Sequence, residues 1–382
     1  MALQVRQLDV LRGLAIVMMV VNHASVALPS PDLQRNAVIA GLSFIGSFAP
    51  VVFFFATGFG IGIARDKVTT REFQSSVFKS LLLVVADQFL YWKNNTPSGL
   101  DFLSFIAIST VLVNAVAAYS RPVRLSSLLV VASLALRFAC GSWLSSRISA
   151  TPLIDWIIGY RAVENVSYPL SPWIIYPLLG FIMARRYRSC DESLAQSLLP
   201  WPSVLASSAL VCAVAMWLNG AAFFRWGTMN FAFFALSIDV IFLSLVAAWL
   251  LNDFWPKAAL LLALRGISSL AAVPIHYALI NALVTLEIAP RESLDMVVLI
   301  LAIIALTIWL AKAFAAAVRL WMSSASTTIA TGALFAVLLL SAALTWASPP
   351  GSWAIFAYFV AGQLAVAGLL LKQPANPIVA GH

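Results

Sequence analysis

Charged residues are scarce in this sequence. Asp, Glu, Lys and Arg make up 10% of the 382 residues, whereas soluble domains carry about 25%. This shortage excludes an ordinary cytosolic globule and also a disordered chain, which is rich in charge. Cysteine is scarce as well, and Cys140, Cys190 and Cys212 show no spacing typical of a disulfide framework, a redox motif or a zinc site. No cluster of carboxylates and histidines with the spacing of metal ligands occurs either, so no metal cofactor is expected.

Apolar residues make up 62% of the chain and fall in long blocks. A helix needs about 20 mainly apolar residues to cross the hydrocarbon core of a bilayer. The sequence therefore predicts an all-α fold, a polytopic transmembrane helix bundle with about 10–12 spans in the lipid bilayer. The expected spans are 8–29, 40–64, 76–92, 101–119, 125–144, 170–184, 202–219, 230–251, 264–286, 294–318, 328–346 and 352–371.

The net charge of +8 indicates membrane orientation rather than nucleic acid binding. If the N-terminus is cytoplasmic, the alternating spans place 16 of the 23 basic residues on the inner side and six on the outer side. This bias follows the positive-inside rule. We therefore expect a multi-pass protein of the cell (inner or plasma) membrane, with a cytoplasmic N-terminus and no nucleic acid partner.

Ionisable residues inside the expected spans are few, and each is a candidate functional residue because charge is costly in hydrocarbon. Two of the three histidines of the chain are among them. Histidine is the side chain best suited to proton transfer near neutral pH, which makes both histidines catalytic candidates. The ionisable residues in the spans are Asp9, Arg12, His23, Asp87, Arg137, Asp239 and His276.

Arg12 and His23 are eleven residues apart, which on a helix returns to nearly the same face. The helical rise places His23 about 16 Å beyond Arg12 along the axis. Asp9, three residues before Arg12, can pair with it. This face suits a long anionic cofactor whose phosphates meet Arg12 while its reactive end reaches toward His23. Alternatively, Arg12 only anchors the helix at the inner surface, and His23 is a polar residue at its outer end.

Three further segments carry unusual patterns. Phe48–Arg65 has small residues at alternate positions, which allow close approach of a slender ligand or, more commonly, of another helix. Tyr168–Gly180 contains three prolines and Trp173. This pattern indicates either irregular backbone that lines a cavity or an aromatic belt at the membrane interface. Arg265 precedes His276 by eleven residues, which predicts a second face with an arginine and a histidine.

The segment Leu8–His23 (LDVLRGLAIVMMVVNH) resembles the transmembrane acyltransferase superfamily, and within it the type-3 acyltransferases, whose first helix carries an arginine, ten residues and a histidine. Val51–Gly62 is similar to their second helix, and Arg265–Ile280 to their late histidine helix. Tyr168–Arg185 (YPLSPWIIYPLLGFIMAR) and Asp101–Leu103 look more like the heparan-glucosaminide acetyltransferase relatives and the osmoregulated-glucan succinyltransferases.

This resemblance implies transfer of an acyl group, most often acetyl, from cytoplasmic acyl-CoA to a hydroxyl or amine of a cell-surface or exported carbohydrate. It implies His23 as general base or acyl carrier, Arg12 in the same catalytic site, and His276 as a further catalytic residue. Residues that would bind CoA are Arg12, Gly58, Gly60, Arg65 and Arg71. Residues that would bind the acceptor are Asp101 and Trp173.

The resemblance also divides the chain. Residues 1–320 are expected to form the membrane acyltransferase domain, and residues 321–382 an additional C-terminal hairpin and tail, whose expected roles are packing or contacts in a homodimer. Two other functions remain open. A transporter or flippase of a small molecule or a lipid-linked sugar also carries rare intramembrane charges, and a scaffold without chemistry explains the spans but not the buried ionisable face.

Overall fold

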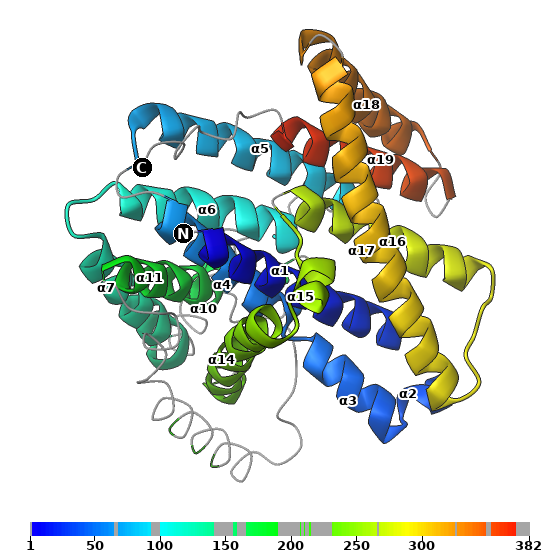
Figure 1. The fold of residues 1–382 in the computed structure, drawn as a ribbon, viewed down its shortest axis with the longest axis horizontal. Helices are drawn as coiled ribbons and strands as arrows, with labels where there is room; N and C mark the ends of the chain where they lie inside the picture. The colour runs from blue at the N-terminus through cyan, green and yellow to red at the C-terminus, as the bar shows by residue number, and fades with distance from the viewer. Residues whose placement is uncertain are drawn as a thin grey trace. The chain divides into compact units, whose positions relative to one another are not determined.

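The fold is described from a computed structural model of the chain (Figure 1). The structure describes residues 2–64, 68–92, 100–140, 156–158, 166–189, 207, 210, 214, 231–265, 267–324, 327–348 and 353–371. Its elements are α1 (Ala2–Ala27), α2 (Pro31–Gln34), α3 (Ala37–Gly46), α4 (Ala49–Ala64), α5 (Thr70–Trp92), α6 (Phe102–Ala117), α7 (Pro122–Leu134), the π-helix η1 (Ala135–Ala139), α10 (Leu170–Trp173), α11 (Ile175–Ser189), α14 (Phe231–Phe254), α15 (Pro256–Leu262), α16 (Ile267–Thr285), α17 (Ser293–Ser324), α18 (Thr327–Ala347) and α19 (Trp353–Leu371).

The expected polytopic helical bundle is confirmed. Six helical segments of the described residues are long and apolar enough to cross a membrane, and three shorter apolar helices accompany them. Helices α5 and α11 lie over two further expected spans, whereas the span expected at 202–219 falls almost wholly outside the described residues. The six segments are Gln7–Ala27, Ala37–Ala64, Pro122–Ala139, Phe233–Phe254, Ser268–Thr285 and Ser293–Met322.

Local sequence signals set several helix starts. Thr69 and Glu72 form a reciprocal capping box before α5, in which the Thr69 Oγ1 accepts the Glu72 N–H at 3.3 Å and the Glu72 carboxylate accepts the Thr69 N–H at 2.9 Å. Helix α7 begins with Pro122, whose missing N–H is not needed in a first turn. Ser171 departs from helical geometry, with φ −97° and ψ 124°. The irregular backbone expected in this proline-rich segment is thereby confirmed.

The chain falls into two compact units, which we describe separately. Unit 1 comprises Met1–Met19, Phe44–Tyr91 and Thr96–Ala263, and unit 2 comprises Val20–Ser43, Trp92–Asn95 and Leu264–His382.

Unit 1 is built around the packing of α4 against α11, the most extensive helix pair in the described part of the chain. An aromatic cluster fills its interior, with Phe54 against Phe105 at 4.3 Å between ring centroids and Tyr168 against Trp173 at 4.9 Å. These side chains are almost completely buried. The phenylalanine run of the second expected span therefore serves mainly as core.

Unit 2 contains the C-terminal part of α1 together with α16, α17, α18 and α19. Within it, α18 packs against α19 as the hairpin expected near the C-terminus, and α16 packs against α17 (Figure 1). Helix α17 runs without interruption to Ser324. The sequence division placed after residue 320 stays a prediction.

Candidate functional site

Two imidazoles from distant parts of the sequence meet inside unit 2. His23 lies on α1, and His276 lies on α16 and is completely buried. The His23 Nδ1 and the His276 Nε2 are 2.8 Å apart, although 253 residues separate the two histidines in the chain. The two ring planes are nearly parallel, with an interplanar angle of 14° and centroids 5.1 Å apart, as expected for imidazoles that meet edge to edge. The two intramembrane histidines singled out in the sequence therefore form one pair.

The hydrogen bonds of this pair fix the position of each proton. The His276 Nδ1 lies 3.0 Å from the carbonyl oxygen of Ala272, which can only accept, so the Nδ1–H of His276 donates to it. In neutral His276 the Nε2 is then an acceptor, and the His23 Nδ1–H donates to it. The Nε2 of neutral His23 consequently carries a lone pair. His276 thus orients His23 so that Nε2 is its basic nitrogen.

Tyr277 is the third member of the cluster and was missed from the sequence. Its hydroxyl oxygen lies 3.4 Å from the His23 Nε2 and donates a long hydrogen bond to that lone pair. Its ring lies against both imidazoles, with centroids 4.7 Å from His23 and 4.5 Å from His276. The sequence did carry a signal for this residue, because a tyrosine directly follows the histidine in the expected span 264–286.

Helix α1 is held next to His23 by a second polar contact within unit 2. The side-chain amide of Asn22 donates to the carbonyl oxygen of Ser43 on α3 at 2.9 Å. This contact fixes the rotation of α1 at the turn that carries the histidine. The position of the His23 ring is therefore determined both by the pair with His276 and by the neighbouring backbone.

The pairing expected between Asp9 and Arg12 is confirmed in unit 1. The Arg12 Nη1 lies 3.2 Å from the Asp9 Oδ1, and the two side chains are 22% and 2% exposed. Helix α1 is continuous from Ala2 to Ala27, so Arg12 and His23 lie on one helix as expected. Their separation along its axis is about 16 Å.

The glycines of α4 differ in what surrounds them. A Cβ at Gly58 would overlap the carbonyl oxygen of Pro177 on α11, and one at Gly62 would lie 2.6 Å from the Cβ of Ala184. Helix packing, the commoner reason for small residues, is thereby confirmed at both positions. Gly60 instead faces α1, where its Cβ position is 3.0 Å from the Arg12 Nη2. Gly60 thus makes room for the Arg12 guanidinium.

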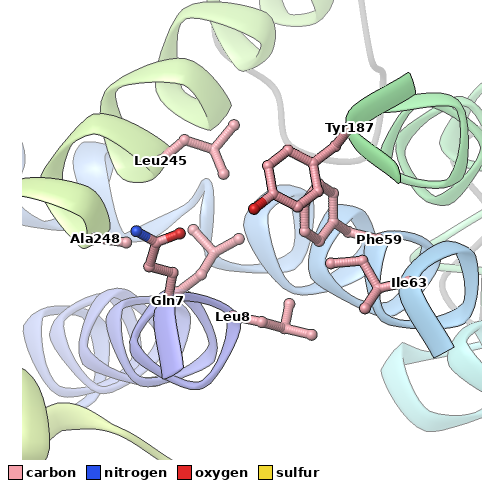
Figure 2. Close-up of a pocket in the computed structure, with 8 residues that line it drawn as sticks. Gln7, Leu8, Phe59, Ile63, Tyr187, Leu245 and Ala248 are labelled. Atoms are coloured by element: carbon pink, nitrogen blue, oxygen red, sulfur yellow. The ribbon is translucent and has the colours of Figure 1, made fainter. Parts of the chain in front are cut away.

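A small pocket of about 10 Å³, partly open to the outside and with room for about one water molecule, lies in unit 1. Figure 2 shows the Tyr187 hydroxyl directed into the space between the surrounding helices. The walls are mainly apolar and come from α1, α4, α11 and α14. Its lining residues are Gln7, Leu8, Leu11, Phe59, Ile63, Tyr187, Leu245 and Ala248.

The remaining predicted site residues lie at separate places. Arg71 is exposed in the first turn of α5, and Arg65 lies outside the described residues. Asp101 precedes α6 in extended conformation and is partly exposed. Trp173 is 1% exposed within the aromatic cluster of unit 1. Their proposed contacts with CoA or acceptor stay predictions.

One expected geometry is wrong. Helix α16 begins at Ile267, so Arg265 lies before it in non-helical backbone and is exposed. The helical spacing that would place Arg265 and His276 on one face therefore does not apply. In the parts of the chain that the structure describes, no group of three or more His, Cys, Asp or Glu side chains is placed to hold a metal ion.

The candidate membrane-spanning helices and the histidine pair define the class of this protein. It is a membrane protein that holds a basic imidazole, that of His23, among its helices. The family model of the heparan-alpha-glucosaminide N-acetyltransferase catalytic domain matches residues 4–205, more than half of the chain. The chain therefore belongs to this family, and it is a membrane acyltransferase. No curated protein and no solved structure matches the chain.

This match confirms the expected acyltransferase family, whereas the resemblances to type-3 acyltransferases and to glucan succinyltransferases stay predictions. The matched range includes Arg12, His23 and the glycines of α4. His276 and Tyr277 lie beyond it. Their assignment to the site therefore depends on the contacts with His23 alone.

Proposed function

We propose that this protein transfers an acyl group, most often acetyl, from cytoplasmic acyl-CoA to a hydroxyl or amine of a cell-surface or exported carbohydrate. The observation that supports this proposal best is the hydrogen bond between His23 and His276. It leaves a lone pair on the His23 Nε2, in a helix that the family match includes. Acyl transfer from a thioester needs a base of this kind to remove the proton of the acceptor.

His23 is the general base in this proposal, and His276 is the residue that positions it. When the His23 Nε2 takes the acceptor proton, the Nδ1–H of the resulting imidazolium still donates to the His276 Nε2. In this respect the pair resembles a catalytic histidine whose second ring nitrogen is held by a hydrogen-bond partner. Here His276 is that partner. Because His276 is neutral in this arrangement, it orients the His23 ring without placing the full negative charge of a carboxylate inside the membrane.

Arg12 is the anchor proposed for the phosphates of the donor. Its guanidinium carries five N–H donors, and the bond to Asp9 uses one of them in a geometry that holds the group in place. Gly60 lies beside Arg12, and its neighbour Phe59 lines the apolar pocket. Arg65 and Arg71 are proposed as further phosphate contacts.

The orientation follows from the charge bias of the sequence. The proposed N-terminus is cytoplasmic, which places the Arg12 end of α1 on the side where acyl-CoA is made and His23 deeper in the membrane. Asp101 and Trp173 are proposed to contact the acceptor. The family name refers to a glucosaminide, so an amino sugar is the first acceptor to test.

The test is release of CoA from acetyl-CoA by the purified full chain in liposomes, with glucosamine or N-acetylglucosamine as acceptor. Glucosamine offers an amine and hydroxyls, whereas N-acetylglucosamine offers hydroxyls alone. His23→Ala is expected to lower kcat by about 10²–10⁴-fold, the usual contribution of a general base. His382→Ala removes the third histidine of the chain and serves as the matched control, with wild-type activity.

Two results would contradict the proposal. One is wild-type turnover in His23→Ala, and the other is no CoA release by the wild type above protein-free liposomes. Binding of acetyl-CoA separates an acyltransferase from a transporter. A ligand at 100 times its Kd stabilises the folded state by about 2.7 kcal/mol, so the apparent Tm is expected to rise with acetyl-CoA, which a transporter of another molecule would not show.

A further inference from the structure

The Tyr277 hydroxyl lies where a reacting group would have to be. It is 3.4 Å from the His23 Nε2, the nitrogen whose lone pair the two imidazole hydrogen bonds leave available. A hydrogen bond of this length is weak, because good bonds to nitrogen are nearer to 2.9 Å. An acceptor hydroxyl or amine can therefore replace Tyr277 at His23 at small cost.

We propose that Tyr277 is a catalytic residue that donates its O–H to the carbonyl oxygen of the thioester while His23 removes the acceptor proton. This inference rests on the proposed acyl transfer and adds a second functional group to it. In the resting protein the hydroxyl points to the His23 Nε2. In the reaction the acceptor takes that place, and the same hydroxyl bonds to the oxygen that becomes negative.

The step balances as follows. The acceptor oxygen or nitrogen attacks the thioester carbon, its proton passes to the His23 Nε2, and the carbonyl π electrons move onto the oxygen, which receives the hydrogen bond from Tyr277. The carbonyl then reforms, the carbon–sulfur bond breaks, and the CoA thiolate takes the proton from the His23 imidazolium. No oxidant, metal or further reactant is needed.

The ring of Tyr277 makes contacts that hold the phenol beside the two histidines. The ring lies against His23 and His276 at centroid distances of 4.7 and 4.5 Å, and α16 carries both Tyr277 and His276. A donor held in advance at the place of developing charge is the arrangement that stabilises an oxyanion most effectively. Phenylalanine would keep the ring contacts and remove only the O–H.

Tyr277→Phe is the decisive variant, measured in the same CoA-release assay with the full chain. Loss of one oxyanion donor is expected to lower kcat by about 10²–10³-fold. The KM for acetyl-CoA is expected to stay within about threefold, because the bond forms only in the transition state. Tyr119→Phe is the matched control, since Tyr119 is 58% exposed and distant in sequence from both histidines.

Nuclear magnetic resonance of isotope-labelled histidine tells this role from a structural one. The chain has three histidines, so the spectrum is simple to assign with His382→Ala. Both His23 and His276 are expected to carry their proton on Nδ1, in the wild type and in Tyr277→Phe alike. Unchanged tautomers with a large fall in kcat support the proposal.

Three outcomes overturn it. One is a Tyr277→Phe kcat within about twofold of the wild type, which is too small for a lost oxyanion donor. Another is a change of the histidine tautomers in Tyr277→Phe, which would make Tyr277 a residue that merely holds the pair. The third is a rise in KM with unchanged kcat. Failure of the proposed function itself is recognised separately, because the wild type would then release no CoA.

Discussion

The contact between α4 and α11 gives the sharpest prediction about stability. A Cβ at Gly58 would overlap the Pro177 carbonyl oxygen and lie 2.7 Å from the Pro177 Cα. Comfortable contacts between carbon atoms are about 3.5–4.0 Å. Because the obstruction is backbone, Pro177 cannot rotate away, and the two helices must separate. Gly58→Ala is therefore expected to destabilise unit 1.

The magnitude follows from two opposing effects. Overpacking a tight contact costs about 1–3 kcal/mol, and a backbone obstruction places the cost at the upper end. Alanine recovers about 1 kcal/mol of helix propensity. The net loss is about 2 kcal/mol, which corresponds to a fall of about 4–8 °C in Tm at about 2–4 °C per kcal/mol.

The assay is the apparent Tm of purified protein in detergent, without acetyl-CoA. Gly332→Ala is the matched control because nothing lies within 4 Å of the added Cβ. It gains only propensity, so its Tm is expected to rise by about 2–4 °C for about 1 kcal/mol. A Tm of Gly58→Ala equal to or above the wild-type value would refute the reasoning. If that variant instead lost only its binding of acetyl-CoA, Gly58 would make room for the donor.

Two further predictions concern buried carboxylates. Asp9→Asn keeps the size of the side chain but removes the charge that faces Arg12, so the free energy of unfolding is expected to fall by about 1–3 kcal/mol; an unchanged Tm would show that this pair does not stabilise the start of α1. The Asp87 Oδ2 accepts the Ser104 N–H in the first turn of α6 at 3.0 Å. Asp87→Ala is expected to cost about 1–3 kcal/mol, because the Ser104 N–H loses its acceptor. Asp87→Asn keeps an acceptor oxygen and is expected to cost less, as measured by Tm; equal effects would show that the acceptor oxygen is not what matters.

The sequence alone was sufficient to predict most of the helices and to single out the ionisable residues that are costly in a membrane. Apolar runs of span length predicted α1, α14, α16 and α17 to within a few residues at most ends, because hydrocarbon thickness limits span length directly. The same cost singled out His23 and His276 as unusual. Small residues in α4 predicted close packing, which the Gly58 contact with Pro177 confirms.

The contact that defines the site could not be predicted in the same way. Nothing local links His23 with His276, since periodicity describes neighbours on one helix and not the pairing of two helices 253 residues apart. Tyr277 was overlooked because a tyrosine in a span is unremarkable until its partner is known. The expected face of Arg265 and His276 was wrong because α16 begins only at Ile267, and helix starts are the least certain feature of a pattern.

The distance in sequence between the two histidines has a consequence for biosynthesis. Translation proceeds at about 5–20 residues per second, so the ribosome reaches His276 roughly 13–50 s after His23. Late in that interval the nascent chain contains all of residues 4–205, yet the His276 Nε2 that accepts the His23 Nδ1–H is still missing. We therefore expect a ribosome-bound or prematurely terminated product to be inert toward thioesters, and activity to begin only when α16 has been inserted.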